Sequence, residues 1–174
     1  HHPKLYFVDN VDPDSVDTLL KNLPLNQTGV LCVSKSGGTV ETLSQVLLFI
    51  ESFKQSGLEI SSHMYALVEE GENPLRILME HYGVAILNHP KNIGGRFSVL
   101  SLVGLLPALL ANVDVFSIRN GAEAVLDKFL RNPLKSEPSK GGALSFLATK
   151  NGMNMHVMMP YSDRLRVFSD WFVQ

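Results

Sequence analysis

Short apolar runs alternate with amphipathic stretches along this chain, and no other feature constrains its fold as strongly. A short run that is apolar on both faces is typical of a strand buried in a parallel sheet, and an amphipathic stretch is typical of a helix that covers such a sheet. We therefore expect an α/β fold, a Rossmann-like sandwich with a mostly parallel sheet flanked by helices. The expected strands are residues 5–8, 29–33, 64–68, 83–87 and 154–159.

Capping residues and apolar spacing mark the expected helices. Asp12 and Pro13 predict a helix that runs to about Leu23, because an aspartate caps free amides and a proline at the first helical position loses no needed donor. Residues 98–111 are apolar nearly all round, so this helix is expected deep in the structure. Residues 131–142, with two prolines and two glycines, are expected to form a loop, and residues 69–72 a solvated loop rich in glutamate. The remaining helices are expected at 39–53, 74–81, 122–130, 143–149 and from Ser162 onward.

Composition excludes several classes of function. The 174 residues, at about 150 per domain, suggest one domain. Their net charge of −2 gives no footprint for nucleic acid or an acidic membrane surface. A single cysteine excludes a disulfide scaffold and fits a reducing cytosol, so a cytoplasmic location is expected. Residues 99–118 include Pro107, Asn112 and Asp114 and do not resemble a membrane span. The start of the chain does not resemble a secretion signal, and the histidines lack metal-ligand spacing, so we expect no metal and no cofactor.

The strongest chemical signal is the segment Ser34-Lys35-Ser36-Gly37-Gly38-Thr39-Val40-Glu41-Thr42, between an expected strand and an expected helix. Two glycines let the backbone turn tightly, and the helix start offers unpaired amides and a positive dipole end to an anion. The hydroxyls of Ser34, Ser36, Thr39 and Thr42 can donate to phosphate oxygens. The spacing of nucleotide-binding loops is missing, which favours a small phosphorylated ligand. The alternative is a plain turn whose hydroxyls only cap the helix.

This segment resembles the phosphate-binding loop of sugar isomerase (SIS) domains, in particular that of the glucose-6-phosphate isomerase (phosphoglucose isomerase) family. Two further blocks extend the resemblance in family order. Asn92-Ile93-Gly94-Gly95-Arg96-Phe97-Ser98 resembles the family's Gly-Gly-Arg-Phe/Tyr-Ser signature, and Pro160-Tyr161-Ser162-Asp163-Arg164-Leu165 resembles its stretch before the catalytic carboxylate. The chain is thus identified as part of a first SIS domain over residues 1–174, incomplete at both ends.

The resemblance implies roles for named residues. It assigns phosphate binding to Ser34, Ser36, Thr39 and Thr42, with help from the Lys35 amide and from Gly37 and Gly38, which admit the ligand to the backbone. It assigns Arg96, beside Gly95, to the stabilisation of a cis-enediolate formed between an aldose and a ketose phosphate, a charge that a fixed guanidinium favours electrostatically. Glu41 would support an active-site histidine from the neighbouring subunit of a homodimer, and Gln174 would contact the substrate near the base. Arg96 could instead form a structural ion pair, and Glu41 could be a plain helix-start charge.

The resemblance also predicts what these residues cannot do alone. The family's glycine-rich loop after its first strand, its glutamate base one helical turn past Gln174, and the histidine and lysine of a second SIS domain have no counterpart here. We therefore expect part of a glucose-6-phosphate isomerase, inactive in this form, with a sugar phosphate as ligand. The alternative is a non-catalytic SIS module that binds sugar phosphates.

Overall fold

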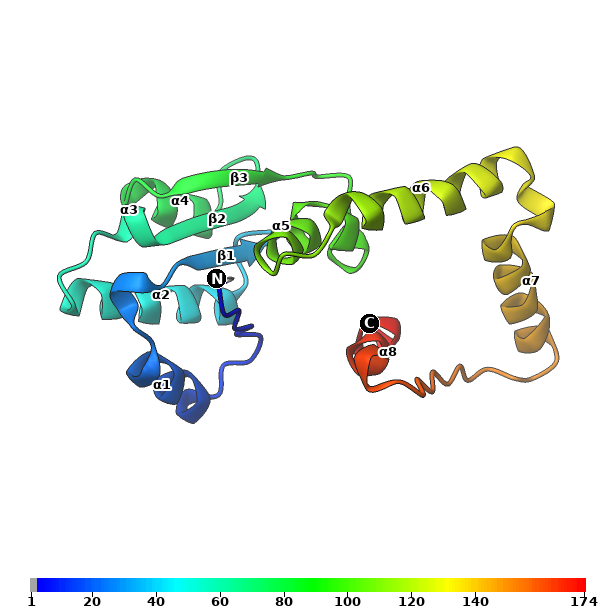
Figure 1. The fold of residues 1–174 in the computed structure, drawn as a ribbon, viewed down its shortest axis with the longest axis horizontal. Coiled ribbons are helices and arrows are strands. Elements are labelled where there is room, and N and C mark those ends of the chain that lie inside the picture. The colour runs from blue at the N-terminus through cyan, green and yellow to red at the C-terminus, as the bar shows by residue number, and fades with distance from the viewer. Residues whose placement is uncertain (1–2) are drawn as a thin grey trace. The chain divides into compact units, whose positions relative to one another are not determined.

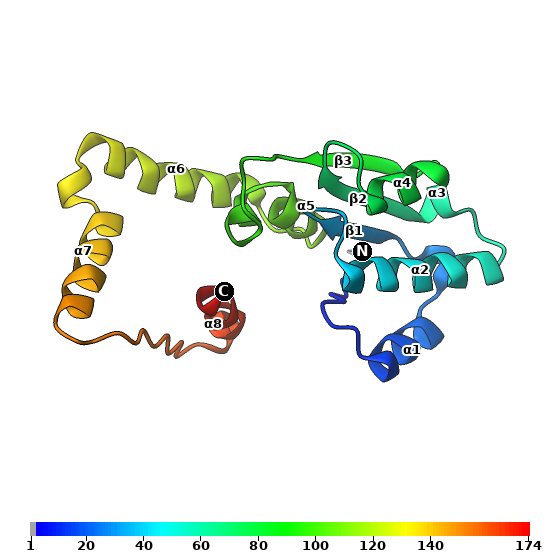
Figure 2. The ribbon, with the colours of Figure 1, turned by 180° about the vertical axis from the view of Figure 1, so that it is seen from behind.

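The computed structural model describes residues 3–174, which divide into two compact units. The first unit ends at Asn112 and contains every strand of the described chain, and the second unit runs over Val113–Gln174 and is built from helices (Figures 1 and 2). None of the helices within residues 3–174 has the length and apolar character needed to cross a membrane.

A three-stranded parallel sheet in the order β1-β2-β3 organises the first unit. Its strands are β1 (Val30–Ser34), β2 (Met64–Glu69) and β3 (Ala85–His89). The register sets Ser34 beside Val68 and Glu69 beside His89, so the three strands end close to one line. The strands expected at 29–33, 64–68 and 83–87 are confirmed, as is the parallel α/β architecture.

The helices α1, α2 and α4 lie close to where the sequence predicts them. In α1 (Pro13–Asn22) the carboxylate of Asp12 accepts from the Ser15 amide at 2.9 Å, the predicted cap. The longest helix of the first unit, α2 (Val40–Gln55), follows β1, and α4 (Pro74–His81) joins β2 to β3. The shorter elements of this unit are η1 (Leu25–Gln27), α3 (Ile60–His63), η2 (Gly95–Leu100) and α5 (Leu102–Leu110).

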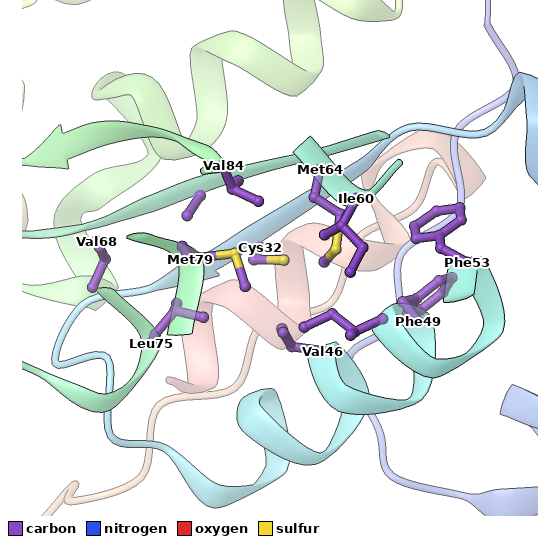
Figure 3. Packing of buried hydrophobic residues seen from close by; sticks show 12 residues of the cluster. Cys32, Val46, Phe49, Phe53, Ile60, Met64, Val68, Leu75, Met79 and Val84 are labelled. Atoms are coloured by element: carbon purple, nitrogen blue, oxygen red, sulfur yellow. The ribbon is translucent and has the colours of Figure 1, made fainter. Parts of the chain in front are cut away.

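The hydrophobic core lies on one face of this sheet, where α2 and α4 supply most of the covering side chains (Figure 3). Alternate residues of β2, namely Met64, Ala66 and Val68, are fully buried there, as the two-residue period of a strand requires. Phe53 of α2 and Met79 of α4 are fully buried against the same face. The core therefore packs the middle and end of α2 against the sheet.

Two predictions for the first unit are wrong. Residues 5–8 form no strand, and Phe7 is 75% exposed, since an apolar run becomes a strand only where a partner strand accepts its hydrogen bonds. The apolar helix expected over 98–111 divides into η2 and α5 and is not deeply buried: Leu109 is 57% exposed. The reason is that α5 packs chiefly against η2, a short element that covers only part of its apolar surface.

The second unit consists of α6 (Val115–Arg131), η3 (Pro133–Lys135), α7 (Glu137–Lys150), η4 (Asp163–Leu165) and α8 (Arg166–Val173). The helices expected over 122–130 and from Ser162 onward are confirmed. The loop expected over 131–142 is wrong for its second half, because Ser136 caps α7 by accepting from the Ser139 amide at 3.4 Å and Pro138 fits the first turn. The strand expected over 154–159 is also wrong, since the described residues of this unit contain no strand with which it could pair.

Candidate phosphate-binding site

Three connecting segments leave the sheet at the edge where its strands end. Residues 35–39 follow β1, residues 70–73 follow β2, and residues 90–94 follow β3 and lead into η2. Because the strands are parallel, all three segments begin at the same edge, which is where α/β sheets bind their ligands. The predicted phosphate loop and the segment that leads to Gly95 and Arg96 thus begin at one edge, with the end of β2 between them.

Side-chain and backbone contacts shape the loop from within. The Gly37 amide donates to Ser34 Oγ at 3.1 Å, and the Gly38 amide donates to Ser36 Oγ at 3.4 Å. Gly37 has a φ of 67°, the left-handed region in which glycine is favoured. The segment is therefore a tight turn whose two serine oxygens are engaged as acceptors.

Those contacts leave the serine hydroxyl protons able to point elsewhere. A hydroxyl has one donor and two acceptor lone pairs, so an oxygen that accepts an amide can still donate to a phosphate oxygen. Ser36 and Thr39 are exposed and Thr42 is partly exposed, whereas Ser34 is 7% exposed. The geometry thus makes Ser36, Thr39 and Thr42 accessible to a ligand, and gives Ser34 mainly a place inside the turn.

The start of α2 supplies the charge complementarity that an anion requires. Thr39 is the N-cap residue, with its carbonyl accepting from the Leu43 amide at 3.0 Å, and its side chain makes no capping bond within the described chain. The first amides of a helix have no intrahelical acceptor, and the helix dipole places partial positive charge at this end. Glu41 lies in this first turn and is exposed, a position that suits a carboxylate.

Lys35 is bound to the end of β2. Its ammonium lies 3.4 Å from the Glu69 carboxylate, and its carbonyl accepts from the Glu69 amide at 3.2 Å. The loop is therefore fastened to β2 through both the backbone and the side chain of Lys35. The solvated loop predicted over residues 69–72 begins one residue later, because Glu69 is the last residue of β2. Residues 70–72 are exposed, and Glu70 accepts from the Asn88 side chain at 2.7 Å.

Gly95 and Arg96 open the short helix η2, with Gly94 as its N-cap residue. The Arg96 side chain is exposed, and its guanidinium carbon lies 6.0 Å from the centre of the Phe97 ring. Ser98 donates to the Gly95 carbonyl at 2.6 Å, and a Cβ added at Gly95 would meet no described atom within 4 Å. The backbone at Gly95 is thus open to close approach.

Gln174 is the C-cap residue that follows α8 in the second unit, and it is exposed. The substrate contact predicted for Gln174 stays a prediction. So do the phosphate binding predicted for the loop residues and the roles predicted for Gly95 and Arg96.

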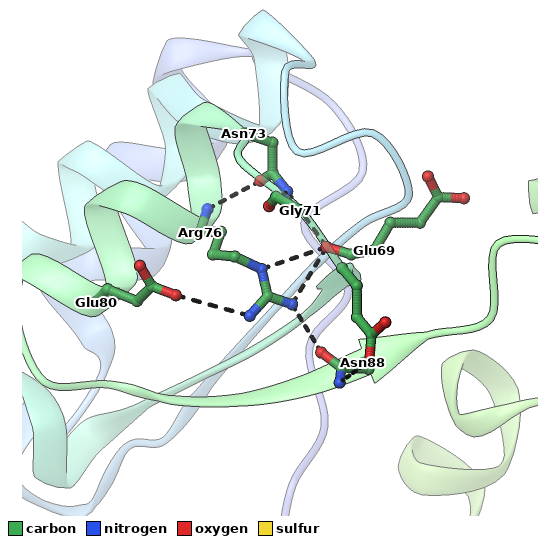
Figure 4. A network of polar contacts seen from close by, with 7 residues as sticks. Glu69, Gly71, Asn73, Arg76, Glu80 and Asn88 are labelled. Carbon is green, nitrogen blue, oxygen red and sulfur yellow. Dashed lines mark hydrogen bonds and ion pairs between the residues drawn. The ribbon is translucent and has the colours of Figure 1, made fainter.

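Sequence reasoning missed the residues that support the loop from α4. Asn73 is the N-cap of α4, and Arg76, one turn later, donates to the Glu69 carbonyl at 3.3 and 3.2 Å and to Asn88 Oδ1 at 2.7 Å (Figure 4). The pair Asn73-Pro74 could have been identified as a helix start. The contacts of Arg76 with Glu69 and Asn88 join separate segments of the chain, and no local sequence pattern predicts them.

Residues 3–174 contain no group of three histidine, cysteine or acidic side chains placed to hold a metal ion. The loop and the start of α2 present hydroxyls and amides, a set of groups that suits an oxyanion such as phosphate.

Comparison with known proteins decides the family. The sequence model described as phosphoglucose isomerase matches residues 1–174. The chain belongs to the phosphoglucose isomerase family. It is 37% identical to a glucose-6-phosphate isomerase of Carboxydothermus hydrogenoformans, over 99% of this chain and 38% of that protein, and 36% identical to one of Thermus thermophilus, over 98% and 41%. The chain therefore spans about two fifths of the length of these curated relatives.

Solved structures agree with this assignment to the phosphoglucose isomerase family. The crystal structure of a hypothetical protein from Thermus thermophilus superimposes with a TM-score of 0.90 at 36% identity, covering 97% of this chain and 40% of that one. A glucose-6-phosphate isomerase from Chlamydia trachomatis gives 0.75 at 28% identity, covering 93% and 32%. The resemblance and the α/β fold inferred from the sequence are confirmed.

Proposed function

We propose that these residues form the phosphate-binding part of a glucose-6-phosphate isomerase, which interconverts glucose 6-phosphate and fructose 6-phosphate. The observation that carries the proposal is the shared sheet edge: a glycine turn and a helix start follow β1 there, and the segment that leads to Arg96 follows β3. Membership of the phosphoglucose isomerase family supports it. Action in the cytoplasm and as a homodimer are further parts of this proposal.

In the proposed mechanism the phosphate anchors the sugar. Hydroxyls of Ser36, Thr39 and Thr42 donate to its oxygens, and the amides at the start of α2 face its charge. A base then moves a proton between adjacent carbons of the sugar, and negative charge develops on oxygen in the cis-enediolate. The Arg96 guanidinium stabilises that charge, and Gly95 leaves room for the sugar to approach.

The remaining roles complete the proposal. Gln174 contacts the substrate near the base, and Glu41 supports a histidine from a neighbouring subunit. The base is a glutamate about one helical turn past Gln174, so the 174 residues by themselves perform no isomerisation.

The decisive experiment measures the conversion of fructose 6-phosphate into glucose 6-phosphate. We expect no turnover above a buffer blank from the 174-residue chain, and turnover from the gene product that continues past Gln174. In that active protein, Arg96→Gln is expected to lower kcat about 100-fold or more with a smaller change in KM, because Arg96 acts on the transition state. Turnover by the 174 residues would overturn the proposal that the base lies past Gln174. An Arg96→Gln enzyme with full kcat would overturn the role of Arg96.

Ligand binding tests the phosphate site separately. Titration with fructose 6-phosphate, followed by amide chemical shifts, is expected to move the signals of Gly37, Gly38 and Thr39. The variant Ser36→Ala is expected to weaken this binding, and Ser52→Ala, in the body of α2, serves as a matched control. Binding without turnover in the longer gene product would instead favour a non-catalytic sugar-phosphate module.

A further inference from the structure

The start of α4 holds the phosphate loop at its turning point. The Leu75 amide, in the first turn of α4, donates to the Gly37 carbonyl at 2.9 Å. A Cβ added at Gly37 would overlap Oδ1 of Asn73 and would lie 2.5 Å from its Cγ. The Asn73 side chain therefore occupies the space next to Gly37 that any other residue at position 37 would need.

Asn73 is itself held at three points. Its Oδ1 accepts from the Arg76 amide at 2.9 Å, and its Nδ2 donates to the carbonyls of Glu69 and Gly71 at 3.3 and 3.1 Å (Figure 4). These partners belong to α4, to the end of β2 and to the segment between them. An amide bonded on both its oxygen and its nitrogen has one orientation, so Asn73 presents a fixed surface to Gly37.

The position of Gly37 in turn sets where the ligand-facing groups lie. Gly37 is followed by Gly38 and by Thr39, the N-cap of α2, so a shift at Gly37 moves the amides at the start of that helix. Hydrogen bonds to a charged ligand depend steeply on distance and angle, and a small displacement weakens several of them together.

We propose that Asn73 is a positioning residue for phosphate binding, acting through Gly37 on the loop and on the start of α2. This inference rests on the proposed function, since it needs the loop to be the phosphate site. In this role Asn73 acts through Gly37 and needs no contact with the phosphate. The role also differs from capping α4, which a shorter side chain could perform.

The test separates positioning from capping with two variants of the 174-residue chain, probed with inorganic phosphate. Asn73→Ser keeps a good N-cap residue but loses the amide group that reaches Gly37, Glu69 and Gly71. We expect the unfolding midpoint of this variant to stay near that of the parent chain. Its Gly37 and Gly38 amide signals should shift even without ligand. Its phosphate affinity should fall about tenfold, which corresponds to the loss of one charge-assisted hydrogen bond.

Asp114→Ala is the matched control, because Asp114 caps α6 in the second unit. It is expected to lose helix stability while its phosphate affinity stays unchanged. Parent-like affinity in Asn73→Ser would overturn the positioning role and leave the proposed function intact. A parent chain that binds no phosphate at the loop would overturn the proposed function and the positioning role with it.

Discussion

Gly37 is the residue whose backbone the phosphate loop depends on most. Its φ of 67° is costly for a residue with a Cβ, and an added Cβ would also meet Cγ2 of Val68 at 3.0 Å. We predict that Gly37→Ala lowers the free energy of unfolding by about 1–2 kcal/mol from backbone strain alone, with a further loss as Asn73 is displaced. Denaturant unfolding of the variant measures this change.

Gly38 provides the control for that substitution. A Cβ added there meets no described atom within 4 Å, and Gly38 is not among the positive-φ glycines. Gly38→Ala is expected to leave stability within about 0.5 kcal/mol of the parent chain. Equal losses in the two variants would show that the loop does not impose the left-handed backbone at Gly37.

The Cys32 thiol makes a second residue-scale prediction. It lies in β1 and is 4% exposed, and burial raises the pKa of Cys32 to about 12. The unfolded thiol has a pKa of about 8.5. Because the folded pKa is higher, the neutral thiol stabilises the folded chain below that pH, and this contribution is lost as the pH rises toward 12. We predict that iodoacetamide modifies Cys32 slowly at about pH 8 in the folded chain and quickly after unfolding, as mass spectrometry would record. Equal rates in the two states would contradict the buried position.

Among the elements, α6 has a cap whose strength depends on pH. Asp114 accepts from the amides of Phe116 and Ser117 at 3.0 and 3.1 Å and from the Ser117 hydroxyl at 2.6 Å. The side-chain and backbone bonds of Ser117 lower the pKa of Asp114. A lowered folded pKa contributes stability that is present above the unfolded pKa of about 3.9 and is lost as pH falls through the folded value.

We therefore predict that the first turn of α6 frays on acidification. Backbone chemical shifts of Val115–Ser117 should move toward coil values below about pH 4. Asp114→Asn keeps a capping oxygen but removes the titrating group, so its first turn should respond less to pH. A first turn with the same acid response in both proteins would contradict the cap assignment.

The elements also show how far sequence can predict structure. The apolar runs of β1, β2 and β3 and the cap Asp12 are local signals, and the structure confirms each of them. Residues 5–8 and 154–159 carry the same apolar signal without a partner strand, and pairing is a long-range property that composition does not encode. Glycines and prolines predicted a loop over 131–142, yet the cap at Ser136 starts α7 there.

The candidate site divides in the same way. Its loop could be predicted because two glycines and four hydroxyls lie within nine consecutive residues, 34–42. Its support could not, since the contact of Asn73 with Gly37 and the bonds from Arg76 to Glu69 and Asn88 join residues that meet only when the sheet forms. Such contacts follow from sheet register rather than from any local pattern.

For the whole molecule, burial is distributed unevenly between the two units. Every described hydrophobic residue that is buried lies before Asn112, and in the second unit only Ser136, among the described residues, is buried. Side chains such as Phe116 at 76% and Leu144 at 71% exposure leave the helices of that unit with little apolar burial. Helices depend mainly on such burial, because isolated ones shorter than about 12–15 residues are marginal in water.

Exposed apolar area on this scale predicts self-association of the 174-residue chain. Sedimentation at increasing concentration is expected to show a rising mean mass, and Leu144→Lys together with Phe116→Lys should reduce it. A single monomer mass across the concentration range would contradict this expectation.

Hydrogen exchange should reveal the same division along the chain. Amides of β2 and the buried turns of α2 and α4 open only with unfolding of the core, so they should exchange slowly, whereas amides of α7 and α8 should exchange quickly in dilute solution. Because association covers apolar helices, protection in α7 and α8 should rise with protein concentration while that of β2 stays constant. Mass spectrometry of peptides from both units would measure this. Slow exchange in α8 at the lowest concentration would show that the second unit has a source of stability besides apolar burial.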